Sequence, residues 1–219
     1  MKRDKSTISR ELKRNCGQRG YRPKQSHELS LARMRAKDTL GEIAMAQLIF
    51  KDSIDYSKVK VHNEGYLPFG LQGTNTAMTP NGEMYFGSTR FKDDFSQGQD
   101  AQSINEKHWF MHEMVHVWQY QLGYPVRARG AIRFGLDYKY DLAKDKSLSD
   151  YNMEAQGDLL ADYFALKFLN DTNAMTDAQQ RYSNDLPLYE QVLKNFLADP
   201  KDASNLPGGN VSRPSRREF

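Results

Sequence analysis

The stretch that decides the fold is residues 103–122, which read SINEKHWFMHEMVHVWQYQL. His112 and His116 stand four residues apart, so a helix places both imidazoles on one face, one turn apart. Two imidazoles at this spacing can share one tetrahedral zinc ion. Glu113 lies about 100° further round the helix axis, where it suits a general base better than a third ligand. The apolar residues around the histidines indicate a buried helix, and buried imidazoles need partners.

A catalytic zinc ion needs a third protein ligand and one open position. The chain has five histidines and none follows His116, so a third histidine after the motif is excluded. His108 lies one turn before His112, but three histidines along a straight helix do not easily converge on one ion. We therefore interpret His108 as a neighbour that lines the site, and we expect a carboxylate on another element as the third ligand.

Glu154 is the best candidate for this carboxylate, in the stretch 152–158, which reads NMEAQGD. It stands four residues before Asp158, so one helix face can present Glu154 to zinc and Asp158 to the outward ring N–H of a ligating histidine. Small Ala155 and Gly157 would let this helix approach the histidine helix closely. The rival ligands lie earlier in the chain, at Asp137 and Asp141.

The patterns along the rest of the chain predict an α+β fold, with a small antiparallel sheet followed by the motif helix and further long helices. Capping residues and turn residues give the boundaries. The expected elements are a helix near 39–51, a strand at 59–62, a hairpin of 77–79 and 83–86, and helices near 103–122, 149–170 and 176–198. Residues 124–147 remain unassigned.

The two ends of the chain differ from the middle. Residues 1–27 hold nine Lys or Arg and two acidic residues, whereas the remainder holds 22 Lys or Arg and 26 acidic residues. We expect residues 1–27 to be a basic flexible arm, either simply solvated or docking to phosphate, anionic lipid or an acidic carrier. Residues 28–199 are expected to form the folded domain, and residues 200–219 a flexible tail.

Composition excludes several classes of protein. Cys16 is the only cysteine, so neither an internal disulfide framework nor a cysteine-rich zinc module is possible. No run of about eighteen apolar residues is present, so we expect no transmembrane segment. The basic residues near the start are not followed by an apolar region, so we expect no secretory signal peptide. The net charge of +3 is too small to name a partner.

The motif and the following Glu-x-x-x-Asp pair resemble the gluzincin branch of the zincin metallopeptidases. The longer string at 108–119, HWFMHEMVHVWQ, with EAQGD at 154–158, resembles more narrowly the bacterial toxin-type metallopeptidase domains at the C-termini of VgrG spike proteins or encoded beside type VI secretion and Rhs loci. Its ending is also similar to SprT-like zincins, although the missing downstream histidine counts against that group. The roles implied are zinc ligands His112, His116 and Glu154, general base Glu113, and Asp158 as the partner of a ligating histidine.

This resemblance implies a zincin-like fold and one zinc ion per chain. It implies an antibacterial effector that is made in the bacterial cytoplasm without a Sec signal and exported by a contact-dependent system to the periplasm of a target cell. There it would hydrolyse peptide bonds of envelope or periplasmic proteins. The implied partners are a protein or peptide substrate, a secretion-apparatus carrier and a cognate immunity protein, and nucleic acid is not expected as a main partner.

Three alternatives remain open at this point. They are a peptidoglycan amidase with the same zinc site, a DNA-associated protease tethered by the basic arm, and a non-catalytic zincin-like binding module. Two groups of residues have less specific expected roles. The candidate donors to the oxyanion of the transition state are Tyr138, Tyr140 and Tyr151. The candidate edge strand that pairs with an extended substrate comprises Met84, Tyr85 and Phe86, and an ordinary sheet edge is the alternative.

Overall fold

The computed structural model describes residues 38–67, 72–130 and 137–209, together with the backbone of three short strands that precede them. These strands are β1 (Cys16–Gly17), β2 (Gly20–Tyr21) and β3 (Met34–Arg35), and β1 pairs with β2 antiparallel. The rest of the expected basic arm, residues 1–27, lies outside the described residues. Among the helices that are described, none has the length and apolar character needed to cross a membrane.

A small sheet precedes the motif helix, as the sequence predicts. It holds β3, β4 (Val61–His62), β6 (Met84–Phe86) and β5 (Ala77–Met78), in that spatial order. The predicted hairpin is present, because β5 pairs antiparallel with β6. The sheet is nevertheless mixed rather than antiparallel, because β4 pairs parallel with β6. The predicted strand at 59–62 is shortened to its second half.

Helix α3 (Leu40–Phe50) matches the helix predicted near 39–51 and begins with a capping box. The Thr39 hydroxyl accepts a hydrogen bond from the Glu42 backbone N–H at 3.1 Å, and the Glu42 carboxylate accepts one from the Thr39 backbone N–H at 2.8 Å. Glu42 is fully buried and also accepts from the Phe95 backbone N–H at 2.8 Å. One carboxylate therefore both caps the helix and fastens the loop that leads to the motif helix.

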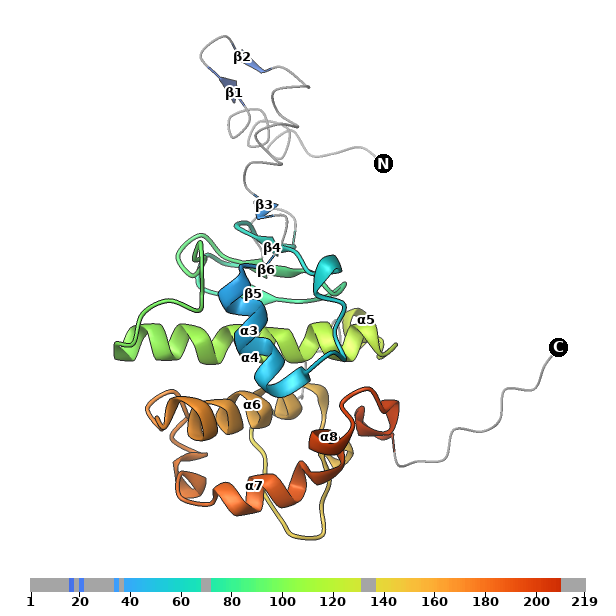
Figure 1. The fold of residues 1–219 in the computed structure, drawn as a ribbon. Coiled ribbons are helices and arrows are strands. Elements are labelled where there is room, and N and C mark those ends of the chain that lie inside the picture. Colours follow the sequence, from blue (N-terminus) through green and yellow to red (C-terminus); the bar gives the residue numbers. More distant parts are fainter. Residues whose placement is uncertain are drawn as a thin grey trace, which may run out of the picture.

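The motif helix, α4 (Ala101–Gln121), runs through the middle of the molecule, between the sheet and α6 (Figure 1). It begins at Ala101, two residues before the predicted start at 103. Its cap is Asp100, whose carboxylate accepts from the Ser103 backbone N–H at 3.0 Å. The helix ends near Gly123, whose φ of 91° suits glycine. A short helix, α5 (Val126–Gly130), follows in the stretch that the sequence left unassigned.

The second helix of the site is α6 (Met153–Phe164). It begins later than predicted, because residues 148–150 form a separate 3-10 turn, η3 (Leu148–Asp150). The Asn152 side chain caps α6 by accepting from the backbone N–H groups of Glu154 and Ala155, at 2.9 and 3.0 Å. The helix continues into a π-helical turn, η4 (Ala165–Leu169), and ends at Asn170 in the left-handed conformation.

The prediction of one continuous last helix from 176 to about 198 is wrong. The structure has a 3-10 turn η5 (Gln180–Tyr182), then α7 (Leu186–Val192) and α8 (Lys194–Ala198). Pro187 lies in the first turn of α7. Proline has no backbone N–H and clashes with the preceding turn, so it can begin a helix but not lie within a continuous one.

The predicted flexible tail, residues 200–219, is corrected for its first ten residues. Residues 200–209 pack on the domain and include the 3-10 turn η6 (Ala203–Asn205). Leu206 belongs to the hydrophobic core. The buried Trp118 indole N–H donates to the Pro200 carbonyl at 2.7 Å, and the Gln156 amide donates to the Asn205 carbonyl at 3.0 Å. Residues 210–219 lie outside the described residues.

A chain that ends at residue 199 is expected to unfold more easily than a chain that ends at residue 209. The shorter chain loses the burial of Leu206 and the two carbonyls that accept hydrogen bonds from the buried Trp118 and Gln156 side chains. These losses should lower the free energy of unfolding by about 3–6 kcal/mol. Thermal unfolding of both chains measures this, since about 1 kcal/mol moves the Tm of a chain this size by about 2–4 °C. Equal Tm values would show that the segment adds no stability.

Candidate metal centre

Polar pairs cross from α4 to α6 at three successive helical turns: His108 with Asp162, His112 with Asp158, and His116 with Glu154. The residue numbers rise along α4 as they fall along α6, so the two helices run antiparallel with their turns in register. This register explains why the sequence needs i, i+4 spacing on both helices. The structure thus brings together the histidines of the motif and the acidic residues predicted to meet them.

Gly157 sets how closely the two helices approach. A Cβ atom built on Gly157 would lie 2.5 Å from Cε1 and 2.7 Å from Nδ1 of His112, closer than real Cβ contacts allow. Only glycine therefore permits the imidazole to lie against α6. The sequence prediction that a small residue here allows close packing is confirmed.

Gly157→Ala is expected to weaken metal binding by about 10-fold or more, the size of effect seen when a ligating histidine is badly held. Alanine favours helix by about 1 kcal/mol over glycine, so the helix itself should not suffer. The added methyl group must instead displace the ring of His112. The reverse change, Ala155→Gly, costs helix stability but leaves His112 in place and should retain affinity. Zinc titration of both variants decides between ring displacement and a general packing effect.

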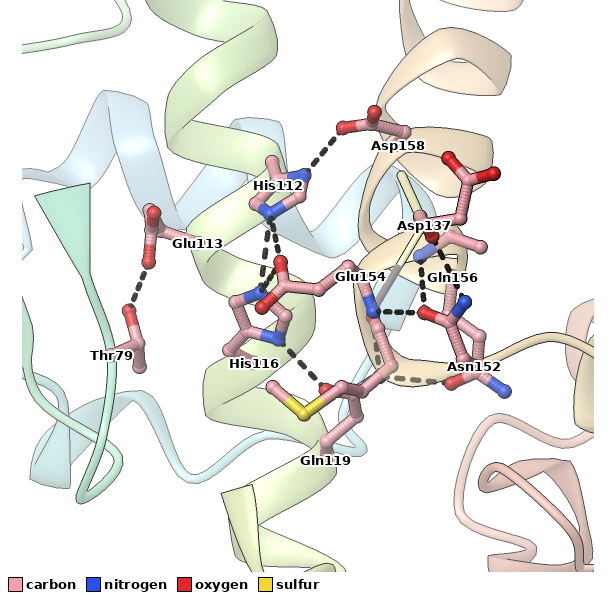
Figure 2. A network of polar contacts seen from close by, with 12 residues as sticks. Thr79, His112, Glu113, His116, Gln119, Asp137, Asn152, Glu154, Gln156 and Asp158 are labelled. Carbon is pink, nitrogen blue, oxygen red and sulfur yellow. Dashed lines mark hydrogen bonds and ion pairs between the residues drawn. The ribbon is translucent and has the colours of Figure 1, made fainter. Parts of the chain in front are cut away.

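Three buried ligand atoms form a small triangle at the meeting point of α4 and α6 (Figure 2). The Nε2 atoms of His112 and His116 lie 3.1 Å apart, and each lies 3.3 Å from Oε2 of Glu154. Ligand atoms about 2.0–2.1 Å from one tetrahedral ion would lie about 3.3–3.4 Å from one another. The triangle therefore has the size of one face of a zinc coordination tetrahedron, and two imidazoles with a carboxylate are suitable zinc ligands.

The charges of the centre suit a cation. Burial alone would raise the pKa of the Glu154 carboxyl, but its close contacts with the imidazoles of His112 and His116 outweigh burial and hold this pKa well below its usual range. Burial alone would lower the pKa of His112, but the bonds to Asp158 and Glu154 outweigh it and raise this pKa well above its usual value. The carboxylates therefore create a site that favours positive charge, which a divalent ion can supply.

Asp158 lies where the sequence analysis expected it. Its Oδ1 is 2.7 Å from Nδ1 of His112, on the ring edge opposite the ligand triangle. A carboxylate can only accept at neutral pH, so the proton of a neutral His112 ring lies on Nδ1 and Nε2 keeps its lone pair for a metal. The contact fixes both the orientation and the tautomer of this histidine.

Asp158→Asn is expected to weaken zinc binding by about 10–100-fold, because the substituted amide keeps the shape but removes the charge that holds His112. The structure offers a matched control one turn away. Asp162 makes the same kind of contact with His108, at 2.7 Å from Nε2, but His108 is not part of the ligand triangle. Asp162→Asn should therefore leave zinc affinity near wild type. Equal effects of the two variants would remove Asp158 from its assigned role.

Glu113 points away from the ligand triangle toward the sheet (Figure 2). The Thr79 hydroxyl, just beyond β5, donates to Oε2 of Glu113 at 2.6 Å. Both side chains line a cavity of about 630 Å³ that also contains the three ligand side chains. A carboxylate held beside a candidate metal centre is suited to take a proton from water. Nothing in the sequence pointed to Thr79, because its contact with Glu113 spans 34 residues.

Comparison with known proteins gives a clear relative, although no protein-family model matches the chain. The chain is 40% identical over 163 residues to the type VI secretion system spike protein VgrG2b of Pseudomonas aeruginosa. A solved structure, the effector domain of this VgrG2b, is 37% identical and covers 67% of the chain and 81% of the solved domain, with a TM-score of 0.49. By sequence identity, the chain is a homologue of one region of VgrG2b.

The similarity has a defined extent. The aligned region covers 71% of this chain but 14% of the whole VgrG2b spike protein. The names of both relatives state a secretion system and an effector domain, and neither names a reaction or a metal. The homology therefore agrees with the resemblance to VgrG effector domains found in the sequence, while the chemistry must be argued from the residues of the site.

The structure separates the three tyrosines that were candidates for the oxyanion donor. Tyr138 lines the cavity, and its ring stacks on His112 with centroids 6.0 Å apart. Tyr140 is corrected, because it is buried behind the site with its hydroxyl bonded to Asp162 and Tyr189. Tyr151 is corrected as well, because its hydroxyl donates to the Asp141 carbonyl at 2.8 Å. In this VgrG2b homologue, Tyr138 is the candidate that remains.

The rival ligands and the predicted substrate strand are also corrected. Asp137 and Asp141 are exposed and lie outside the group of possible metal ligands. The strand of Met84, Tyr85 and Phe86 is β6, which pairs with β4 on one side and β5 on the other, so it has no edge to offer. Within the described residues, β5 pairs with β6 alone, and its residues Ala77 and Met78 line the cavity.

Proposed function

We propose that this chain is a zinc-dependent metallopeptidase that acts as a type VI secretion effector. The ligand triangle of His112, His116 and Glu154 carries the proposal, since its edges of 3.1–3.3 Å match one face of a zinc tetrahedron. The homology to a VgrG2b effector domain supports the effector part. One zinc ion per chain is expected.

Each neighbouring side chain has a role in this proposal. A bound zinc ion would lower the pKa of water and polarise the carbonyl of the scissile bond. Glu113 takes the proton of the attacking water and later gives it to the departing amine. Thr79 orients the Glu113 carboxylate through its 2.6 Å hydrogen bond. Tyr138 stands beside the cavity as a donor to the oxyanion that forms on the attacked carbonyl.

The substrate we propose is an extended peptide. One edge of β5 has no strand partner among the described residues, and β5 flanks the cavity. An extended chain can add to such a sheet edge through backbone hydrogen bonds. This edge favours a peptidase over the alternative of a peptidoglycan amidase, which would use the same zinc and Glu113. We propose a protein of the envelope or periplasm as the target, a secretion spike as the carrier, and a cognate immunity protein as the inhibitor.

Expression in a test bacterium distinguishes these possibilities. Wild-type chain directed to the periplasm should inhibit growth, and the same chain kept in the cytoplasm should not. Glu113→Gln, directed to the periplasm at equal abundance, should be harmless if the protein is an enzyme. Toxicity of this variant equal to that of wild type would instead indicate a non-catalytic module, and toxicity confined to the cytoplasm would overturn the periplasmic target.

A further inference from the structure

The second ring nitrogen of His116 begins a chain of buried side-chain amides. Its Nδ1 lies 2.8 Å from Oε1 of Gln119, which is fully buried (Figure 2). The Nε2 amide group of Gln119 donates to the Met153 carbonyl at 3.2 Å and to Oε1 of Gln156 at 2.9 Å. His116, whose Nε2 is one corner of the ligand triangle, is thus connected through Gln119 to Gln156.

Gln156, the last residue of this hydrogen-bonded series, can orient its amide in only one way. Gln156 is fully buried, and its Nε2 amide group donates to two backbone carbonyls, those of Leu148 at 2.8 Å and Asn205 at 3.0 Å. A carbonyl oxygen can only accept, so the amide of Gln156 must present its NH₂ group to these two atoms. Its oxygen must then face Gln119. A flipped amide would place oxygen against two carbonyls and leave buried groups unpaired.

The orientation of the Gln156 amide determines that of the Gln119 amide by the same reasoning. Gln119 must present its NH₂ group to the oxygen of Gln156 and to the Met153 carbonyl, so its own oxygen faces His116. That oxygen can only accept, and the proton of a neutral His116 ring must therefore lie on Nδ1. The Nε2 atom of His116 is left with its lone pair directed toward Glu154 and His112.

We propose that Gln119 and Gln156 are positioning residues that set the metal-binding tautomer of His116, with the direction imposed by the carbonyls of Met153, Leu148 and Asn205. The inference rests on the proposed metal site. It also gives segment 200–209 a role in the site, because the Asn205 carbonyl is one of the acceptors that orient the amide of Gln156. Asp158 performs the same task for His112 in a single step, with charge.

Histidine ring ¹⁵N NMR tests the tautomer directly. In wild-type protein, with and without zinc, His116 should carry its proton on Nδ1. Gln156→Met removes the amide that reinforces this direction without touching a ligand, and it leaves Gln119 oriented by the Met153 carbonyl alone, so the second tautomer should become partly populated and zinc affinity should fall by about 10-fold. Gln179→Met is the matched control, because Gln179 is also buried and its amide has no hydrogen-bond partner in the part of the chain that the structure describes. It should change neither quantity.

A second pair of variants protects the test against loss of folding. Gln119→Met removes the acceptor of the His116 N–H and should weaken zinc binding by about 10–100-fold. Gln119→Glu keeps an acceptor at that position and should bind zinc more tightly than Gln119→Met. A wild-type His116 protonated on Nε2, or unchanged tautomer and affinity in folded Gln119→Met and Gln156→Met, would overturn the proposal. If wild-type protein binds no zinc, the proposed function fails. The tautomer of His116 in metal-free protein still tests whether Gln119 and Gln156 orient this ring.

Discussion

Replacing Glu113 by glutamine is expected to lower kcat/KM for peptide hydrolysis by about 10³-fold, within the range of about 10²–10⁴ for general acid–base catalysis. Glutamine has nearly the same shape but cannot accept the proton of water at neutral pH. Glu113 is not one of the three converging ligands, so zinc affinity should stay near that of wild type. The measurement is turnover of an unstructured protein substrate, with zinc content determined on the same samples.

Glu106 provides the matched control for this variant. It lies on the same helix, two turns earlier, where it pairs with Lys92 at 2.8 Å and does not line the cavity. Glu106→Gln should retain full activity. Activity of Glu113→Gln near wild type would remove Glu113 as the base and leave the chemistry without an assigned proton acceptor.

Glu154→Ala is expected to weaken zinc binding by more than about 100-fold, beyond the range for losing an outer partner of a ligating histidine. The variant removes one corner of the ligand triangle and the charge that offsets the two imidazoles. Asp137→Ala and Asp141→Ala, at the rival positions, should bind zinc like wild type because both side chains are exposed. Competition with a chromophoric chelator measures all three. Wild-type affinity in Glu154→Ala would refute the assignment of the third ligand.

The parts of the site that could be predicted from sequence are those repeated at helical spacing. The i, i+4 positions of the motif put His112 and His116 on one face, and the same spacing put Glu154 and Asp158 on one face of the second helix. Each helix therefore showed its half of the centre independently. Gly157 added a further signal, because a glycine within a helix suggests close packing.

The parts that could not be predicted depend on contacts between distant segments. Gln119 was visible beside the motif, but its partner Gln156 lies 37 residues away, and the Asn205 carbonyl that orients Gln156 lies 49 residues further. The segment after residue 199 has the composition of a tail, and composition does not reveal that Leu206 fills a place in the core. The prediction that strand 84–86 offers an edge to the substrate was wrong for the same reason, because the pairing of β4 with β6 joins segments that are distant in the sequence.

The central claim is that His112, His116 and Glu154 hold one catalytic zinc ion, and the zinc content of purified protein tests it most directly. Protein prepared without chelators, or reloaded with zinc and freed of excess metal, should contain close to one zinc per chain. X-ray absorption at the zinc edge should show two imidazole ligands and oxygen ligands at about 2.0–2.1 Å. A well-folded protein with no zinc, or with zinc that is retained after loss of both His112 and Glu154, would contradict the account.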